Sequence, residues 1–302
     1  MYGFIGLGQM GLPIALNLLE SGHRPLRVYN RTAAKAATLV EKGAIVVASP
    51  AEAAVPGAVV FTMLSDDRVL EEVVLGSSGF LRRLGPDGVH VSMSTIAPAT
   101  ARRLAQLHEE QACAYLAAPV FGRPDAAAAR KLWICLSGAQ LAKERVAPIL
   151  RHLGQSVFDF GEDPSAAHVI KLAGNFMIGA AMEAVAEAVV ILEKNGVDGL
   201  KAIEMLSDTL FNCPVYRNYG RTIAEHRRAP VGFKLALGRK DLDLVVQTAG
   251  ACQAPMPLAN LVRDRLIAAM AKGRADMDWS ALALGAAEDA GLDRKTISPP
   301  TS

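Results

Sequence analysis

Short apolar runs alternate with amphipathic segments along the first half of the chain. The segments between the runs repeat apolar residues at the three- and four-residue spacing of a helix that rests on a core. The predicted strands are Tyr2–Gly6, Leu26–Asn30, Ala44–Val47, Ala58–Leu64, Val89–Ser94, Ala114–Val120, Leu132–Leu136 and Val157–Phe160. Strands that alternate with helices pair in parallel through crossovers, so this half predicts a mainly parallel, doubly wound α/β domain with helices on both faces.

The strand pattern ends after Gly161, and the rest of the chain has a helical pattern. Residues 165 to about 195 form one long predicted helix, which Gly196 ends. Prolines punctuate the later helices, such as 257–272. We therefore expect a domain at 1–163 and an all-α domain at 164–302, joined by the long helix, with a frayed tail at 296–302.

The long helix is apolar enough to raise the question of a membrane span. Its stretch Leu172–Leu192 contains Glu183 and Glu187, which lie four residues apart on one helical face. A membrane span would place both carboxylates in hydrocarbon at high cost, so we expect a buried or interfacial helix in which they are solvated or contact another helix.

Composition narrows the class of protein further. With 51% hydrophobic residues and a formal net charge of +2, the 302-residue chain can bury a large core and offers no basic stripe for nucleic acid or a membrane surface. Its four cysteines have no paired spacing, and no leader precedes the strand at Tyr2, which favours a reducing, cytoplasmic location without a structural metal.

A glycine motif, GLGQMG at Gly6–Gly11, follows the first strand and opens a helix. In this context Gly6 allows a tight turn, Gly8 lets backbone approach a pyrophosphate, and Gly11 lets the helix pack close to the strand. The helix N-terminus adds N–H donors and partial positive charge. The motif predicts a Rossmann-type dinucleotide site that also includes Leu7, Gln9 and Met10; a tight turn without ligand is the alternative.

The second strand ends at Asn30-Arg31-Thr32, where an NAD site usually carries an acid for the ribose hydroxyls. A carboxylate would repel a 2′-phosphate, whereas Arg31 can pair with it bidentately and Thr32 can donate a hydroxyl. Lys35, in the next helix, adds positive charge. These residues predict NADP(H); the alternative is a solvated helix start.

The long helix contains IKLAGNF, which places Lys171 and Asn175 one turn apart on one face. Apolar neighbours on both sides indicate a partly desolvated ammonium. Burial lowers the pKa of a lysine toward neutrality, where the group can exchange a proton with a carbonyl oxygen. A solvated surface lysine is the alternative that the spacing alone leaves open.

Several ordered motifs resemble the β-hydroxyacid dehydrogenases, a family that includes 3-hydroxyisobutyrate dehydrogenase and glyoxylate/succinic semialdehyde reductase and, more distantly, 6-phosphogluconate dehydrogenase. The motifs are GFIGLGQMG at Gly3–Gly11, NRT at Asn30–Thr32, TML at Thr62–Leu64, MSTIAP at Met93–Pro98, APV at Ala118–Val120, KLAGN at Lys171–Asn175 and GRKDLDL at Gly238–Leu244.

The resemblance implies that Lys171 is the catalytic acid/base and that Asn175 orients the substrate. It also implies that Ser94 and Thr95 lie beside the nicotinamide, that Lys240 reaches the cofactor side, and that the chain forms a homodimer or a dimer of dimers through its C-terminal helices. Ser94-Thr95 and Met63-Leu64 end strands at the carboxyl edge, where open α/β sheets bind ligands. Strand capping, and for Lys240 an exposed pair with Asp241, are the alternatives.

One loop departs from the family pattern D-A-P-V-S-G-G, because Ala117–Arg123 reads A-A-P-V-F-G-R. Phe121 replaces a hydroxyl with a ring, and Arg123, after Gly122, offers a fork for a carboxylate. We assign Phe121, Gly122 and Arg123 to the substrate side; packing of Phe121 and a solvated Arg123 are the alternatives. His168 is expected on the helix surface, with tuning of Lys171 as the alternative.

Together these residues predict an NADP-dependent oxidoreductase that moves a hydride between NADP(H) and a small β-hydroxy acid or its semialdehyde or keto acid. Two other functions stay open. An imine reductase shares the architecture but usually has another residue type at the position of Lys171. A non-catalytic, NADP-binding regulatory module would keep the fold and lose the chemistry.

Overall fold

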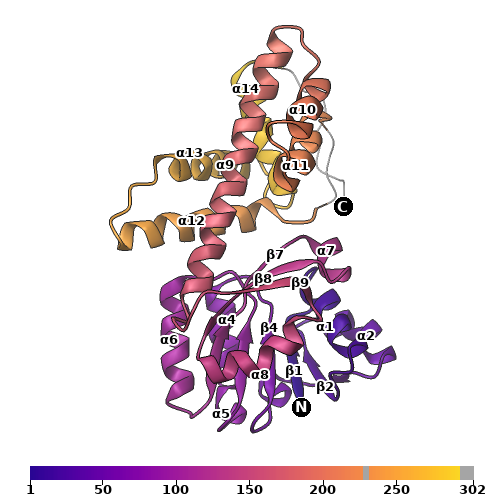
Figure 1. The fold of residues 1–302 in the computed structure, drawn as a ribbon, viewed down its shortest axis with the longest axis vertical. Helices are drawn as coiled ribbons and strands as arrows, with labels where there is room; N and C mark the ends of the chain where they lie inside the picture. Colours follow the sequence, from indigo (N-terminus) through magenta and orange to yellow (C-terminus); the bar gives the residue numbers. More distant parts are fainter. Residues whose placement is uncertain (227–230, 293–302) are drawn as a thin grey trace. The chain divides into compact units, whose positions relative to one another are not determined.

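The computed structural model describes residues 1–226 and 231–292, so the predicted frayed tail at 296–302 lies outside the described residues. The chain divides into two compact units, an N-terminal unit at Met1–Lys171 and a C-terminal unit that begins at Leu172 (Figure 1). This division falls later than the expected boundary at 163/164. It lies inside helix α9 (Ala166–Lys194), because the first turns of that helix pack on the N-terminal sheet, where Ala167 is buried.

The N-terminal unit contains a nine-stranded sheet in the order β3-β2-β1-β4-β5-β6-β8-β7, with β9 paired to β8. All pairs from β3 to β6 are parallel, as predicted. The strands are β1 (Tyr2–Ile5), β2 (Leu26–Tyr29), β3 (Ile45–Val46), β4 (Val59–Thr62), β5 (Val89–Ser92), β6 (Ala114–Ala117), β7 (Val120–Phe121), β8 (Leu132–Gly138) and β9 (Gly154–Asp159).

One predicted strand is in fact two. The run Ala114–Val120 breaks after Ala117, because Pro119 has no N–H to donate to a sheet ladder. The carbonyl of Pro119 still accepts from the N–H of Cys135 at 3.0 Å. Short β7 then pairs antiparallel with β8, where Phe121 lies opposite Trp133.

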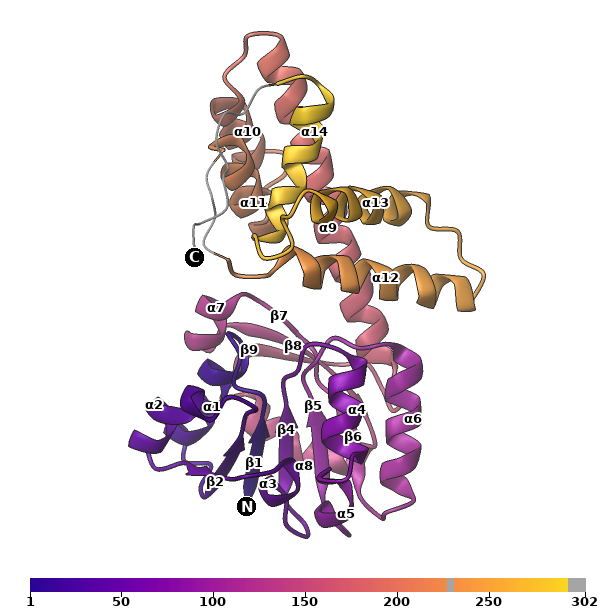
Figure 2. The same cartoon turned by 180° about the vertical axis from the view of Figure 1, so that it is seen from behind.

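Helices cover both faces of this sheet (Figure 2). One core layer contains side chains of α1 (Gly11–Glu20), α2 (Ala37–Glu41) and α8 (Gln140–Leu150). The other contains side chains of α4 (Asp67–Leu75), α6 (Pro98–Glu109) and the start of α9. The remaining helices are short: η1 (Ala33–Ala36), α3 (Pro50–Ala53), α5 (Leu81–Leu84) and α7 (Pro124–Ala128). The layers confirm the doubly wound α/β prediction.

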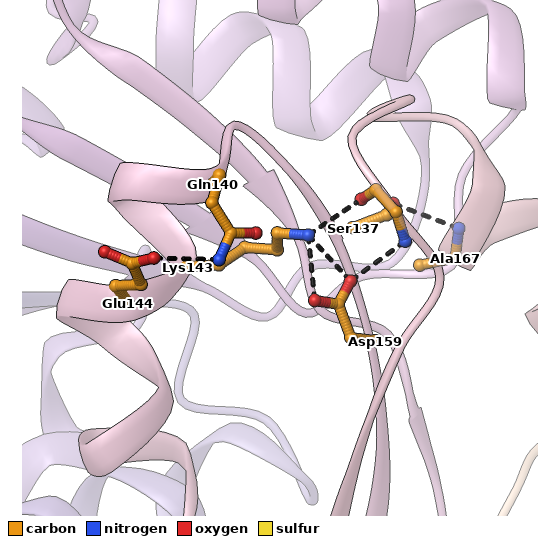
Figure 3. Close-up of polar contacts among 7 residues, drawn as sticks. Ser137, Gln140, Lys143, Glu144, Asp159 and Ala167 are labelled. Atoms are coloured by element: carbon orange, nitrogen blue, oxygen red, sulfur yellow. Dashed lines mark hydrogen bonds and ion pairs between the residues drawn. The ribbon is translucent and has the colours of Figure 1, made fainter.

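The start of α9 is fastened to the sheet by polar contacts (Figure 3). The N–H of Ala167 donates to Ser137 Oγ at 3.1 Å. Nearby, the buried ammonium of Lys143 lies 2.8 Å from each carboxylate oxygen of Asp159, which also accepts from the N–H of Gly161. The hydrogen bond from Lys143 holds the pKa of Asp159 below its usual range. The chain therefore enters α9 from a fixed point on the sheet.

The C-terminal unit is all-helical over its described residues, as predicted, apart from one isolated bridge between Lys234 and Asp278. Its helices are α10 (Gly199–Asp208), α11 (Pro214–Ala224), α12 (Leu235–Ala251), α13 (Pro257–Ala271), η2 (Trp279–Leu282) and α14 (Ala283–Asp289), together with the longer part of α9 (Figure 1). The indole of Trp279 donates to Tyr219 at 2.8 Å, which joins η2 to α11.

Helix α9 is long and apolar enough to cross a bilayer by length and composition alone, with 39% of its most apolar window buried inside the protein. One of its buried acidic positions has a partner within the C-terminal unit. Glu183 is buried and accepts from Arg265 Nε of α13 at 2.6 Å, and burial raises the pKa of this carboxyl. This ion pair is the interhelical contact that the sequence predicted for Glu183.

Two fully buried histidines link the N-terminal sheet to α6. His90 of β5 contacts Thr62 Oγ1 at 2.9 Å and His108 of α6 at 3.1 Å, and His108 Nδ1 lies 2.6 Å from the carbonyl oxygen of Leu104. Burial lowers the pKa of His108 to about 4 and that of His90 well below its usual value. Both rings are therefore neutral in the folded protein.

We expect acid to destabilise the protein through this pair. The unfolded state takes up a proton on His108 near pH 6.5, whereas the folded state takes it up only near pH 4, so stability is lost as the pH falls through that window. The loss for His108 alone is about 3 kcal/mol. Urea unfolding between pH 8 and pH 5 captures about 2 kcal/mol of it, because proton uptake by the folded state near pH 4 lies below that range. His108→Asn should flatten the pH dependence, and Gln106→Asn, at an exposed position of the same helix, is the control and should keep it; equal slopes would contradict the prediction.

Candidate functional site

The parallel strands create a ligand-binding edge between β1 and β4. From β1 the sheet continues through β2 and β3 on one side and through β4, β5 and β6 on the other, so the crossovers diverge at this point. Open α/β sheets bind ligands outside the carboxyl ends of strands at such a switch point. The glycine turn at Gly6–Gly11 follows β1 at this edge.

The three glycines of the turn have different reasons to lack a side chain. Gly6 has a φ of +100°, and a Cβ there would lie 2.3 Å from the carbonyl oxygen of Met63. A Cβ on Gly11 would lie 1.9 Å from the carbonyl oxygen of Gly6. Both are therefore required by close packing. Around Gly8 there is open space, with nothing within 4 Å of a Cβ, so the protein itself does not exclude a side chain.

Gly8 thus supports the dinucleotide interpretation of the motif. A glycine that the fold does not need is explained by a ligand that approaches its backbone closely. The residues present fit the pyrophosphate of a nicotinamide dinucleotide, because the exposed turn leads directly into the N-terminus of α1. Exposed Gln9 and partly buried Met10 lie in the same turn.

Asn30, at the end of β2, braces the turn. Its Oδ1 accepts from the buried N–H of Leu7 at 2.9 Å, and its Nδ2 donates to the carbonyl of Thr32 at 2.9 Å. The sequence assigned Asn30 to the cofactor site; the structure shows that its amide holds two segments of that site in register. Arg31, Thr32 and Lys35 are exposed beyond it, at the start of η1.

The ends of β4 and β5 are joined in a similar way. Ser94 is buried, and its Oγ accepts from the N–H of Leu64 at 2.9 Å. The hydroxyl that the resemblance places beside the nicotinamide therefore orients the Met63-Leu64 segment. Thr95 follows it and is partly buried. Five residues that the sequence assigned to the site therefore lie on neighbouring segments at one edge of the sheet: Gly6, Leu7, Met63, Leu64 and Ser94.

Lys171 is partly buried, and its Nζ lies 4.2 Å from the centroid of the Phe121 ring. This contact brings together two predicted site residues that are far apart in the sequence. Buried Cys135 of β8 belongs to the core cluster against which Phe121 packs, and burial raises the pKa of its thiol. Gly122, exposed with a φ of +137°, and partly buried Arg123 continue the loop.

His168 is not on the helix surface as expected, because the first turns of α9 lie on the sheet. Its side chain is fully buried, and Nε2 lies 3.2 Å from the hydroxyl of Tyr115 on β6. His168 precedes Lys171 by one turn, so this hydrogen bond ties the segment that carries the lysine to the centre of the N-terminal unit. The pattern of residues along the helix does not indicate this burial.

The C-terminal unit contains a second polar cluster. Asn175 Nδ2 donates to Asp241 Oδ2 at 2.6 Å, and Lys240 Nζ lies 2.9 Å from Asp241 Oδ1. The alternative for Lys240 was an exposed ion pair with Asp241. Because Asp241 is buried, the ion pair is not an exposed one. Sequence reasoning missed Asp241 as a site residue. The adjacent Lys-Asp pair was a signal, but nothing in the sequence linked it to Asn175.

The fold and the site define an NAD(P)-binding oxidoreductase of two domains, and the comparisons with known proteins agree. Residues 1–161 match the family model of the NAD-binding domain of 6-phosphogluconate dehydrogenase. Residues 165–293 match the model described as the NAD-binding domain of NADP-dependent 3-hydroxyisobutyrate dehydrogenase. The chain belongs to the β-hydroxyacid dehydrogenase family, whose members are NAD(P)-dependent hydroxyacid dehydrogenases.

Individual relatives cover nearly the whole chain. An uncharacterised oxidoreductase of Bacillus subtilis is 42% identical over 92% of this chain and 96% of its own length. The 3-hydroxyisobutyrate dehydrogenase of Pseudomonas aeruginosa is 33% identical over 86% of this chain and 89% of its own. The solved structure of the Mycobacterium tuberculosis 3-hydroxyisobutyrate dehydrogenase with L-serine is 28% identical, with a TM-score of 0.83 and coverage of 94% and 98%.

Asn30→Ala should destabilise the folded protein, because it leaves the buried N–H of Leu7 without its acceptor. We expect the free energy of unfolding to fall by about 1–2 kcal/mol. Asn30→Asp is the matched control, since it keeps an acceptor in the same place and should lose less. Urea denaturation of the two variants and the parent measures this. If Asn30→Ala unfolds at the parent's urea midpoint, Asn30 does not brace the turn.

Proposed function

We propose that the protein is an NADP-dependent oxidoreductase that transfers a hydride between NADP(H) and a small β-hydroxy acid or its semialdehyde or keto acid, with Lys171 as the general acid/base. The contact between the Lys171 ammonium and the Phe121 ring carries this proposal, because it supports a partly desolvated, directed amine in the loop region that the family uses for substrate. Family membership supplies the reaction class.

The chemistry follows from the groups present. When bound, the nicotinamide supplies or accepts the hydride. In the reducing direction, Lys171 Nζ donates a proton to the carbonyl oxygen as the alcohol forms; in the oxidising direction, the neutral amine takes that proton back. Anchoring of α9 by Ser137 and His168 limits the positions that the amine can reach.

We assign the cofactor preference to the segment after Asn30. Arg31 and Lys35 are exposed at the end of β2 and the start of η1, and no carboxylate occupies the place where one would repel a 2′-phosphate. Arg31 would pair bidentately with the phosphate and Thr32 would donate its hydroxyl. These residues support NADP(H) over NAD(H).

The substrate side rests on four residues. Arg123 would hold the substrate carboxylate, and Gly122 leaves the backbone of the same loop accessible. Asn175 would orient the substrate, since Asp241 accepts from its Nδ2 and so sets the direction of its Oδ1. Thr95 lies at the carboxyl edge after Ser94, where its hydroxyl would face the nicotinamide and substrate; Lys240 would lie on the cofactor side.

We further propose a cytoplasmic homodimer, or a dimer of dimers, formed through the C-terminal helices. Large apolar side chains support this, because Met177 and Ile191 of α9 and Met205 of α10 are 67%, 64% and 56% exposed. Apolar side chains gathered on one unit are typical of subunit interfaces. Light scattering tests the assembly, and a monomer at micromolar concentration would contradict it.

Replacing Lys171 with Met should leave NADPH binding intact and lower kcat by at least about a hundredfold, because a positioned acid/base contributes roughly 10²–10⁴-fold. The assay follows NADPH oxidation with a panel of small semialdehydes and keto acids, together with a cyclic imine. Turnover of the imine but of no carbonyl would support an imine reductase; tight NADPH binding without any turnover would support a regulatory module.

Arg123→Ala serves as the contrasting variant in that panel. It should raise the KM for acid substrates without the loss of kcat expected for Lys171→Met, since Arg123 is assigned to carboxylate binding alone. Unchanged turnover in Lys171→Met would remove the proposed mechanism.

Arg31→Ala should reduce the preference for NADPH over NADH by roughly tenfold or more, because a charged hydrogen bond to the 2′-phosphate is worth about 1.5–3 kcal/mol. The dissociation constants of NADPH and NADH, measured by fluorescence titration, give the ratio. Arg68→Ala, an exposed arginine of α4, is the control and should keep it. An unchanged ratio in Arg31→Ala counts against the NADP assignment.

A further inference from the structure

We infer that Phe121 is a positioning residue for Lys171: its ring holds the ammonium by a cation–π contact and so sets the pH range over which Lys171 acts as an acid. This inference deepens the proposed function and rests on it. It also gives a role to the largest departure of this chain from the family loop pattern, the ring that stands in place of a hydroxyl.

The strand pairing gives Phe121 its direction. Phe121 of β7 lies directly opposite Trp133 of β8, and residues opposite each other in an antiparallel pair project from the same face. Cys135 lies two positions after Trp133 and therefore shares that face. Cys135 and Phe121 also belong to one apolar cluster, in agreement with this shared face.

The ring is held in place by apolar packing. Phe121 is partly buried against a core cluster that includes Ile96, Ala117, Cys135 and Ala167. Ala167 precedes Lys171 by one turn of α9, so the same cluster supports both the ring and the helix that carries the amine. This packing supports the ring, and the Lys171 ammonium lies 4.2 Å from its centroid, within the distance at which a cation is attracted to a ring face.

Several charged or titratable groups of the N-terminal unit lie near the contact between Lys171 and Phe121. Cys135 of β8 stays a neutral thiol, because burial raises its pKa. His168 lies one turn earlier on α9 and hydrogen-bonds with Tyr115 of β6, whose phenol burial keeps protonated. Arg123, two residues after Phe121, brings positive charge to the loop. To these groups the Phe121 ring adds the negative face that attracts the ammonium.

The consequence is a shift in the pH dependence of reduction. Reduction needs Lys171 in its protonated form, so kcat falls as the pH rises past the point where the amine loses its proton. A ring that stabilises the ammonium extends activity to higher pH. Loss of the cation–π contact should move the alkaline limb of the profile down by about half to one pH unit.

The experiment compares Phe121→Leu with Phe121→Tyr. Leucine keeps an apolar side chain but removes the ring face, whereas tyrosine keeps the face. We expect the alkaline limb of kcat for the reducing reaction to shift downward in Phe121→Leu and to remain within about 0.2 unit of the parent in Phe121→Tyr. Trp133→Leu, which removes the neighbouring ring on the same face, is the matched control and should keep the parent profile.

A second measurement does not depend on catalysis. Competitive acetylation with acetic anhydride, followed by peptide mass spectrometry, reports the pH at which Lys171 becomes nucleophilic, because only the neutral amine reacts. In Phe121→Leu this pH should fall by the same half to one unit. Thermal unfolding confirms that the variants are folded before either profile is compared.

The outcomes separate the two proposals. A lowered acetylation pH together with full turnover in Lys171→Met would support the contact and overturn the proposed function. An unchanged acetylation pH and an unchanged kcat profile in Phe121→Leu would overturn the role of Phe121 and leave the proposed function standing. A shift of equal size in Phe121→Tyr would also overturn it, since a merely structural loss would then explain the result.

Discussion

The attachment of the first turns of α9 to the N-terminal sheet is the constraint on which the site depends. Ala167 donates to Ser137, His168 is buried against Tyr115, and Lys143 fastens the end of β9 just before the helix begins. A lysine on a free helix end would sample many positions, because its side chain has four rotatable bonds. Here the contacts of Ala167 and His168 hold the helix backbone next to Lys171, and the Phe121 ring of β7 contacts its ammonium.

Single side chains also connect the strand ends at the carboxyl edge of the sheet, where the glycine turn lies. Asn30 links β2 to the turn after β1, and Ser94 links the end of β5 to the residues after β4. Each side chain satisfies a backbone N–H that would otherwise be left without a partner near the edge of a sheet. Gly8 is the one glycine of the turn without a steric requirement inside the protein, so the unfilled space beside it is best explained by a ligand.

Much of the fold was predictable because its signals are local. Apolar runs at strand spacing located the strands from β1 to β5 within two residues at each end, and the long helix was expected from 165 to about 195 and observed at Ala166–Lys194. Strand β9 begins three residues before its predicted start at Val157. The predictions were wrong where contacts between segments far apart in the sequence determine the structure. The separate strand β7 exists because Pro119 ends β6 and β8 lies alongside, and His168 is buried because the sheet covers a face that periodicity alone could not assign.

The sequence by itself determined the order of strands and helices, the glycine turn, the Asn30-Arg31-Thr32 segment, the candidate lysine and the family, since each is carried by neighbouring residues or by ordered motifs. Only the tertiary structure decided that Phe121 meets Lys171, that Asn30 and Ser94 brace backbone, and that Asp241 is the partner of both Asn175 and Lys240. The physical reason is that these contacts join residues separated along the chain, and the packing of whole elements determines which side chains meet.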